Sequence, residues 1–330
     1  MVQYSSPVDM FAMQKEMAET PLARELKLIS GLRVKITEPL ARYTSMKIGG
    51  PADYFIEVET SEALARALPL LQRCGTPVCP LGNGSNVLIS DRGIRGAVLH
   101  LIGDFRKIDW RKEGETIWVE VGAACAVTRL ARAAARKGYG GLEFAEGIPG
   151  TVGGALIMNA GAYGSEFEKV VDEVIGVSEQ GQPVRFSRAA ITFIYRGSNL
   201  PSGLVVTQAR LRLRKDEANQ VSTKLQELVR KRKSSQPSGY PNSGSMFRNP
   251  PGDFAGRLIE AAGLKGKKIG QSRISERHAN FIVNLGNAKA EDVRQLMELA
   301  RAEVTKQFGI DLVPEVRLLG DWPADQARAS

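Results

Sequence analysis

The sequence predicts an α+β protein of two or three domains, and three observations support this class. Strand-like and helix-like segments alternate through the first half of the 330 residues. Near residues 215–220 the pattern changes to longer helical segments separated by short strands. Between these parts, residues 147–164 form a glycine-rich, nearly uncharged run. We therefore expect a two-lobed N-terminal module and a smaller C-terminal domain.

The first part contains two predicted helices and a series of strands. Residues 61–74 look helical despite Pro69, and the alanine-rich residues 126–137 end at Gly138, a typical helix stop. The strands are expected at residues 77–80, 87–90, 97–101, 117–121, 170–178 and 204–213.

The second part contains longer helices. Helices are predicted over residues 216–233 and 290–308, and over 253–262, where Asp253 serves as N-cap and Gly263 as terminator. Residues 234–244 are rich in turn formers, whereas residues 281–285 and 310–319 have strand character.

The net charge of +9 predicts solvated basic faces better than a nucleic-acid site. Arg210, Arg212 and Arg214 alternate with apolar residues, as on the outer face of a half-buried strand. Residues 230–233 close a helix, where positive charge suits the helix dipole. Aromatic residues make up only 6% of the chain and do not interleave with these bases. We expect neither nucleic acid nor a membrane as partner.

The sequence favours a cytoplasmic protein. It offers no run of about 18 apolar residues that could span a membrane, and residues 1–32 lack the apolar core of a secretory signal. The first twenty or so residues look like an extension. Cys74, Cys79 and Cys125 lack the spacing of a zinc site, so free thiols are expected and no metal.

The glycine-rich run predicts backbone that approaches a ligand closely. It cannot be an ordinary helix, because glycine weakens a helix and proline breaks one, and it is too apolar for a linker. The turn at residues 81–86 (LGNGSN) can direct several backbone N–H groups at an anion, although a hairpin turn needs similar residues. Together the two loops favour a large planar cofactor with a phosphate tail.

Six motifs, in order from about residue 22 to 320, resemble the UDP-N-acetylenolpyruvoylglucosamine reductases. These are flavoproteins that make UDP-N-acetylmuramate for peptidoglycan. The motifs occupy residues 44–53, 81–86, 147–154, 195–198, 244–250 and 314–316. The short stretch between Arg196 and Ser245 is similar to the subclass that lacks an extra tyrosine-bearing insertion.

The resemblance implies a two-subdomain FAD module of the vanillyl-alcohol-oxidase type, followed by a substrate domain. We expect an N-terminal extension at residues 1–21, FAD-binding subdomains at 22–105 and 106–215, and the substrate-binding domain at 216–330. FAD would be bound and NADPH would be the co-substrate of a monomer. The implied cofactor-binding residues are Gly82, Asn83, Gly84, Ser85, Asn86, Pro149, Gly150, Thr151, Gly153 and Gly154.

The resemblance also assigns the chemistry. NADPH would reduce FAD, and hydride would pass to the C3 methylene of the enolpyruvyl ether of UDP-N-acetylglucosamine. Arg196 and Glu315 would stabilise the enol-like intermediate, Ser245 would protonate C2, and Asn249 would contact the substrate. Val313 stands where the family usually has a second glutamate, so Glu315 is the only candidate there.

Some alternatives stay open on the sequence. Residues 44–53 would lie beside FAD or form only a strand-entry turn, and Asn159 is either a tether near the cofactor or a turn residue. Another FAD enzyme on this module, such as a small alcohol or sugar oxidase, would not need the motif at residues 244–250. A flavin-free anion- or RNA-binding protein would instead use the positive charge.

Overall fold

The computed structural model describes residues 20–323 of the chain. The extension expected over residues 1–21 lies outside this part except for Thr20 and Pro21, which begin helix α2 (Pro21–Lys27). No helix within the described residues is both long and apolar enough to cross a membrane.

The chain divides into two compact units, each built from separate segments. Unit 1 contains the residues up to Ile36, together with Tyr54–Asn83 and Gly96–Ser234. Unit 2 contains Thr37–Asp53, Gly84–Arg95 and the residues from Ser235 onward. The chain therefore passes from one unit to the other five times. The division expected at residues 105 and 215 stays a prediction.

The larger sheet of unit 1 has the path β12-β11-β15-β7-β6 and is antiparallel throughout. Strand β15 carries β8 as a further partner. Its outer residues Arg212 and Arg214 are exposed and Leu211 and Leu213 are buried, which confirms the predicted alternation. The strands are β6 (Ile108–Glu113), β7 (Thr116–Gly122), β8 (Tyr139–Gly140), β11 (Val171–Val177), β12 (Pro183–Ser187) and β15 (Val205–Lys215).

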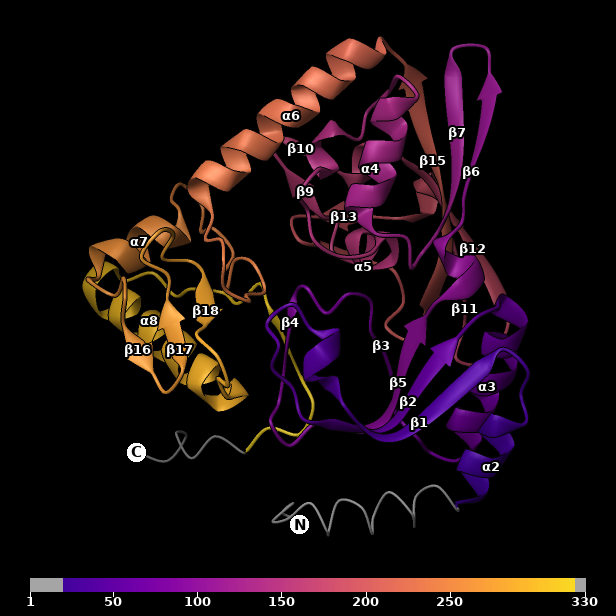
Figure 1. Ribbon diagram of the computed structural model, residues 1–330, viewed down its shortest axis with the longest axis horizontal. Helices are drawn as coiled ribbons and strands as arrows, with labels where there is room; N and C mark the ends of the chain where they lie inside the picture. The colour runs from indigo at the N-terminus through magenta and orange to yellow at the C-terminus, as the bar shows by residue number, and fades with distance from the viewer. Residues whose placement is uncertain (1–19, 324–330) are drawn as a thin grey trace. The chain divides into compact units, whose positions relative to one another are not determined.

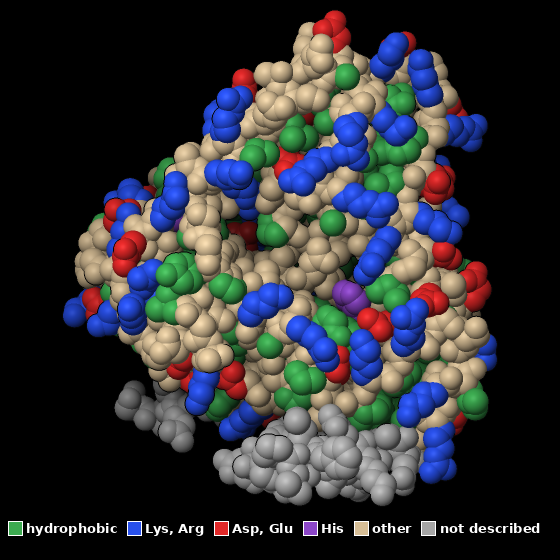
Figure 2. All heavy atoms as spheres, in the orientation of Figure 1, with side chains coloured by type: hydrophobic (Ala, Val, Ile, Leu, Met, Phe, Trp, Pro, Cys, Tyr) green, Lys and Arg blue, Asp and Glu red, His purple; other side chains and the backbone are tan. Residues whose placement is uncertain are grey.

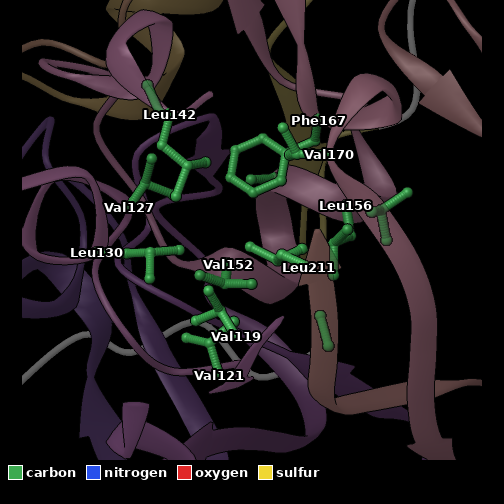
Figure 3. Close-up of a cluster of buried hydrophobic side chains, with 14 of the residues drawn as sticks. Val119, Val121, Val127, Leu130, Leu142, Val152, Leu156, Phe167, Val170 and Leu211 are labelled. Carbon is green, nitrogen blue, oxygen red and sulfur yellow. The ribbon is translucent and has the colours of Figure 1, made fainter. Parts of the chain in front are cut away.

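Two helices pack on this sheet and build the first core of unit 1. Helix α4 (Val127–Arg136) has the expected bounds within a residue, and Gly138 follows it at φ 69°. Helix α5 is the short Val152–Ile157. Their apolar side chains meet those of the strands in Figure 3, where Leu130 and Val152 lie near Val119 and Leu211. Val152, Ala155 and Leu156 of the glycine-rich run belong to this core.

The smaller sheet of unit 1 has the order β1-β2-β5-β3, and β3 pairs parallel with β5. Helices α2 and α3 cover one face of it (Figure 1), with Leu26 and Leu64 buried against Ile56 and Leu99. The elements are β1 (Leu32–Pro39), β2 (Pro51–Val58), α3 (Ser61–Arg73), β3 (Val78–Pro80) and β5 (Ile94–Leu101). Helix α3 continues through Pro69.

Small hairpins and a long helix complete unit 1. Helix α6 (Ala218–Ser235) buries Val221 and Leu228. The hairpins are formed by β9 (Gly161–Ala162) with β10 (Ser165–Glu166), and by β13 (Phe193–Ile194) with β14 (Gly197–Ser198).

Unit 2 packs helices α7 (Ala255–Ala261) and α8 (Ala290–Phe308) against a three-stranded antiparallel sheet. That sheet contains β16 (Lys268–Ile269), β17 (Ser272–Ile274) and β18 (Ile282–Asn284). Early segments complete the unit: β4 (Val87–Ile89) pairs parallel with β19 (Arg317–Leu319). The carboxylate of Asp91 accepts hydrogen bonds from the backbone N–H groups of Ala290 and Glu291, at 2.9 and 3.1 Å, and so caps α8.

Three expectations about local structure are wrong. The glycine-rich run does contain a helix, α5, which the Thr151 side chain caps by accepting from the Gly154 N–H. Helix α7 begins at Ala255 with Phe254 as its N-cap, so Asp253 lies one residue before the cap and pairs with Arg257 instead. The strand expected over residues 310–319 is limited to β19, because residues 313–316 pair with the segment that contains Met246.

The basic side chains are spread over the visible face with acidic ones among them (Figure 2). Several are held in ion pairs within their own unit, such as Arg210 with Asp172 at 2.5 Å and Arg132 with Glu146 at 2.6 Å. The positive charge therefore lies on solvated faces, which agrees with the alternation of exposed and buried residues along β15.

Candidate active site

The two glycine-rich loops meet in unit 1 and line a pocket of about 100 Å³. Five predicted cofactor residues contribute to its lining: Gly82, Asn83, Thr151, Gly153 and Gly154. The remaining lining is mostly apolar and comes from residues 80–81, 99–101, 106, 123–124, 157 and 204–206. An apolar wall with a few polar groups is typical of a small-molecule site.

The glycines allow this pocket because side chains at their positions would fill it or push the loops apart. A Cβ placed on Gly82 would lie 2.5 Å from Thr151 Oγ1, so the two loops touch only because Gly82 has no side chain. A Cβ on Gly153 would lie 3.0 Å from that of Ala123. On Gly154 it would meet only Thr151 Oγ1, at 3.6 Å, so this glycine leaves open space beside the backbone.

The other predicted cofactor residues do not line the pocket. Gly84, Ser85 and Asn86 belong to unit 2, where the Gly84 carbonyl accepts from the Ser45 N–H at 3.1 Å. Pro149 and Gly150 lie just before the pocket-lining Thr151, and the Gly150 carbonyl accepts from the Val127 N–H at 3.1 Å. Their role toward a cofactor stays a prediction.

His100 and Arg106 line the pocket and were not expected from the sequence. The His100 ring stacks on Phe55 at 5.7 Å between ring centroids, and burial lowers the pKa of this histidine. Its Nδ1 lies 3.0 Å from the Leu81 carbonyl oxygen. Because a carbonyl only accepts, Nδ1 carries the proton and Nε2 is left as an acceptor in the neutral ring. The sequence around His100 does not reveal this hydrogen bond, because its partner Leu81 is 19 residues away.

The pocket fits part of a flavin dinucleotide. The exposed backbone at Gly154 suits a flat ring or a phosphate chain, which a side chain would displace. A second pocket, of about 280 Å³, shares the lining residues Pro80 and Val205 with the first.

Arg196 lies in unit 1, in the two-residue turn of the β13–β14 hairpin. Its backbone has φ 58°, a left-handed conformation that non-glycine residues rarely adopt. The guanidinium carbon lies 5.0 Å from the centre of the Tyr195 ring, within the range of a cation–π contact. A strained turn with a stacked guanidinium holds a fixed positive charge at the tip of the hairpin.

Ser245 lies in unit 2 on an extended segment that other backbone segments hold on both sides. It forms an isolated antiparallel bridge with Phe281. The side-chain amide of Asn280 donates to the Phe247 carbonyl at 2.8 Å and accepts from the Phe247 N–H at 2.9 Å. The Asn280 carbonyl accepts from the Met246 N–H at 2.8 Å. Asn280 is buried and was not expected from the sequence.

The segment that contains Glu315 lies against the opposite edge of the segment that contains Ser245. The Glu315 backbone N–H donates to the Met246 carbonyl at 2.8 Å, and the Arg248 N–H donates to the Val313 carbonyl at 2.9 Å. The Asn86 side chain donates to the Glu315 carbonyl at 3.2 Å. The segments that contain Ser245 and Glu315, about 70 residues apart in sequence, are thus paired within unit 2, while Arg196 belongs to unit 1.

Three other residues singled out in the sequence have clear structural roles. Asn249 accepts from the Ala255 N–H at 3.1 Å, at the start of α7, and its contact with substrate stays a prediction. Residues 44–50 do form a strand-entry turn: the Thr44 hydroxyl donates to the Ile48 carbonyl at 2.9 Å, and β2 begins at Pro51. Asn159 has φ 42° and follows α5, so it is a turn residue, yet its side chain is also bonded.

Comparison with known proteins defines the class first. A family model described as an FAD binding domain matches residues 52–187, which contain both glycine-rich loops and the pocket-lining histidine. The chain is therefore an FAD-dependent oxidoreductase with an α+β fold, as the sequence predicted.

Further matches give the family. The model of the C-terminal domain of UDP-N-acetylenolpyruvoylglucosamine reductase matches residues 236–319. The chain is 45% identical over 307 residues to UDP-N-acetylenolpyruvoylglucosamine reductase 2 of Symbiobacterium thermophilum, covering 92% of this chain and 98% of that protein. It is 45% identical over 289 residues to the reductase of Rubrobacter xylanophilus, covering 87% and 95%.

A solved structure agrees. The crystal structure of UDP-N-acetylenolpyruvylglucosamine reductase from Thermus caldophilus matches with a TM-score of 0.75 and 37% identity, over 87% of this chain and 98% of that one. The chain belongs to the UDP-N-acetylenolpyruvoylglucosamine reductase family.

Proposed function

We propose that the protein reduces the enolpyruvyl ether of UDP-N-acetylglucosamine to UDP-N-acetylmuramate, with NADPH as co-substrate, for peptidoglycan synthesis. The observation that carries this proposal is the pairing of the Ser245 and Glu315 segments through Met246. An oxidase working on the same cofactor has no need for a serine and a glutamate held together in this way.

FAD, when bound, supplies the hydride that it takes from NADPH. Residues of unit 1 would hold it: the glycine backbone of the two loops would lie against the cofactor, and His100 lines the same pocket. The apolar lining keeps water away from the reacting atoms, which favours productive transfer over side reactions.

The protein's own groups complete the reaction on the substrate. Hydride addition at C3 places negative charge on C2 and the neighbouring carboxylate. Arg196 pairs with that carboxylate, because a guanidinium keeps its proton and offers two parallel donors. Glu315, together with Arg196, stabilises the enol-like intermediate, and Ser245 donates its hydroxyl proton to C2. A serine is a weak acid in water, so it serves only beside a strongly basic carbon.

The setting of this activity follows from the chemistry. The nucleotide-sugar substrate and NADPH place the enzyme in the cytoplasm, where it acts as a monomer and supports cell-wall formation, cell shape and division. Residues 22–105 and 106–215 serve as the two FAD-binding subdomains and residues 216–330 as the substrate-binding domain.

The decisive experiment separates the two half-reactions in a stopped-flow spectrophotometer. Purified protein is first reduced by NADPH without oxygen and then mixed with UDP-N-acetylglucosamine enolpyruvate, while flavin absorbance is followed. In Ser245→Ala we expect flavin reduction by NADPH to be nearly unchanged and reoxidation by the substrate to slow by about 10²–10⁴-fold, the usual contribution of a positioned acid.

The matched control is Ser243→Ala, which removes a buried hydroxyl from the same turn. It should leave both half-reactions close to those of the parent protein. Equal slowing of both half-reactions in Ser245→Ala would remove the proton-donor role. A parent protein whose reduced flavin is not reoxidised by this substrate would overturn the proposed function itself.

A further inference from the structure

The hairpin that bears Arg196 is bonded to helix α5, whose residues Val152–Ile157 lie along the cofactor pocket. The Asn159 side-chain N–H donates to the Ile194 carbonyl at 3.3 Å, on the first strand of the hairpin. The Ser198 hydroxyl donates to the Ile157 carbonyl at 3.1 Å, from the second strand. Both strands are thus fixed to the end of the same helix, on either side of the arginine turn.

The backbone conformation and the side-chain amide of Asn159 suit this position. It is fully buried, and its φ of 42° directs the chain sharply away from α5. Its side-chain oxygen accepts from the Glu168 N–H at 3.0 Å, which fixes the amide so that its N–H group faces the hairpin. Asparagine is one of the few residues that tolerate this backbone conformation and also carry both a donor and an acceptor.

The helix itself is fixed at its other end by the cofactor loop. Thr151, Gly153, Gly154 and Ile157 line the pocket, and Thr151 caps the helix. The six residues of α5 therefore connect the wall of the pocket to the hairpin. Any shift of the hairpin relative to α5 changes where the Arg196 guanidinium lies with respect to the cofactor.

We propose that Asn159 and Ser198 are positioning residues that set Arg196 relative to the cofactor pocket. The proposal rests on the proposed function, because it assumes that Arg196 meets the substrate carboxylate. It assigns the specific task of alignment to two side chains that touch neither substrate nor flavin in the mechanism above. A displacement of about 1 Å in such a group can cost about 10²-fold in rate.

Four substitutions distinguish the effect of the two side-chain hydrogen bonds from that of the backbone conformation. Asn159→Asp keeps the acceptor for Glu168 but replaces the donor with an oxygen that repels the Ile194 carbonyl. Asn159→Gly keeps the left-handed conformation and loses both bonds. Ser198→Ala removes the second bond, whereas Ser198→Thr retains a hydroxyl. The matched control is Asn287→Gly in unit 2, because Asn287 is exposed and has φ 54°.

The kinetic test measures both half-reactions and the substrate Kd of each variant. We expect Asn159→Asp and Asn159→Gly to slow flavin reoxidation by the substrate about 10- to 100-fold, with flavin reduction by NADPH unchanged. Ser198→Ala should slow it less, and Ser198→Thr should restore it. Asn287→Gly should match the parent protein.

A double-mutant cycle asks whether Asn159 acts through Arg196. In an Arg196→Ala background, Asn159→Asp should cause no further slowing. A full additional loss in that background, or unchanged reoxidation by Asn159→Asp in the presence of Arg196, overturns the proposal. If the parent protein is not reoxidised by the substrate, the proposed function fails instead, so the two failures are distinct.

Limited proteolysis gives a readout independent of activity. Trypsin cleaves after arginine, and the bond between Arg196 and Gly197 lies at the tip of the hairpin. Release of the hairpin in Asn159→Asp should speed cleavage at this bond about 10-fold or more, as followed by mass spectrometry, and Asn287→Gly should not change it. Unchanged cleavage in Asn159→Asp, Asn159→Gly and Ser198→Ala would show that these bonds do not hold the hairpin and would also overturn the proposal.

Discussion

At the scale of single residues, Asn280 shows how one side chain holds a catalytic segment. Its amide group bonds both the N–H and the carbonyl of Phe247, as a neighbouring strand would. The segment bearing Ser245 therefore keeps an extended shape without belonging to a regular sheet. The buried polar groups of that backbone are satisfied by a side chain 33 residues further along the chain.

Replacing Asn280 with alanine should destabilise unit 2. The substitution leaves two backbone groups of Phe247 without these partners. Each buried group left without a hydrogen bond costs about 1–3 kcal/mol of stability. We expect the free energy of unfolding, measured in urea, to fall by about 2–5 kcal/mol. Asn280→Asp keeps the acceptor but sets a carboxylate oxygen against the Phe247 carbonyl in a buried site, so it should lose at least as much. A loss below about 0.5 kcal/mol for the alanine variant would contradict this account.

The residue scale also shows what sequence reasoning misses. The resemblance supplied Ser245 and Glu315, whose segments pair through Met246 in the structure. Asn280 and His100 were not given a site role, and Asn159 stayed open between a cofactor tether and a turn residue, because their partners are backbone atoms 19 to 35 residues away. No spacing in the sequence encodes such a contact, because it arises only once the chain has folded.

At the scale of elements, two loops from distant parts of the chain make one pocket because each removes side chains where the other approaches. Gly82 meets Thr151 in this way, and Thr151 also caps α5. The contact ties the geometry of the 81–86 turn to that of the helix, so the pocket responds to changes in either loop.

Gly82→Ala should weaken FAD binding, because its new Cβ would lie 2.5 Å from Thr151 Oγ1. We expect the Kd for FAD, measured by quenching of flavin fluorescence, to rise about 10-fold, equivalent to about 1.4 kcal/mol. Thr151→Ala removes the opposing oxygen, so adding Gly82→Ala to it should raise the Kd much less than Gly82→Ala does alone. Additive losses in the double variant would show that the two loops do not act through this contact.

Helices and strands were predicted correctly where the local sequence signals agree. They were predicted incorrectly where partners distant in the sequence determine the structure. Helix α8 has the expected bounds, since an apolar stripe ends at Gly309 with φ 69°. The strand expected over residues 310–319 failed because Phe247 and Met246 pair with residues 314–316 and interrupt it. Helix α5 was excluded because glycine disfavours helix, yet packing against Ala123 requires glycine there.

At the scale of the whole molecule, the two histidines give stability a pH dependence. Burial lowers the pKa of both His100 and His278 below 6.5. The unfolded chain therefore binds protons at pH values where the folded chain does not. Stability from these groups is complete above about pH 6.5 and is lost as the pH falls through the lowered values.

We expect the free energy of unfolding to decline as the pH is lowered from 7 to 5, by at most about 1.4 kcal/mol per pH unit for each titrating histidine. The measurement is urea unfolding at several pH values. The double variant His100→Gln with His278→Gln should show a smaller slope over this range. An equal slope in the parent protein and the variant would assign the dependence to other groups.

The C-terminal region should not fold by itself. The core of unit 2 includes Met46, Ile48 and Leu88, which come from early segments of the chain and are buried. Each contributes about 1.5–3 kcal/mol when buried. A fragment of residues 235–330 lacks them, as well as β4 and the Asp91 cap on α8. We expect no cooperative thermal transition by circular dichroism, in contrast to the full chain; a cooperative transition in the fragment would refute this.

The parallel pairing of β4 with β19 also sets an order for events during protein synthesis. Leu88 pairs with Leu318, about 230 residues later. At 5–20 residues per second, a ribosome takes roughly ten to fifty seconds to make the intervening chain. Residues 37–53 and 84–95 cannot complete unit 2 until nearly the whole chain has been synthesised. The last segment of unit 1, in contrast, is complete once residue 234 has been added. Nascent chains stalled before residue 317 should therefore contain a completed unit 1, while β4 still lacks its partner strand β19.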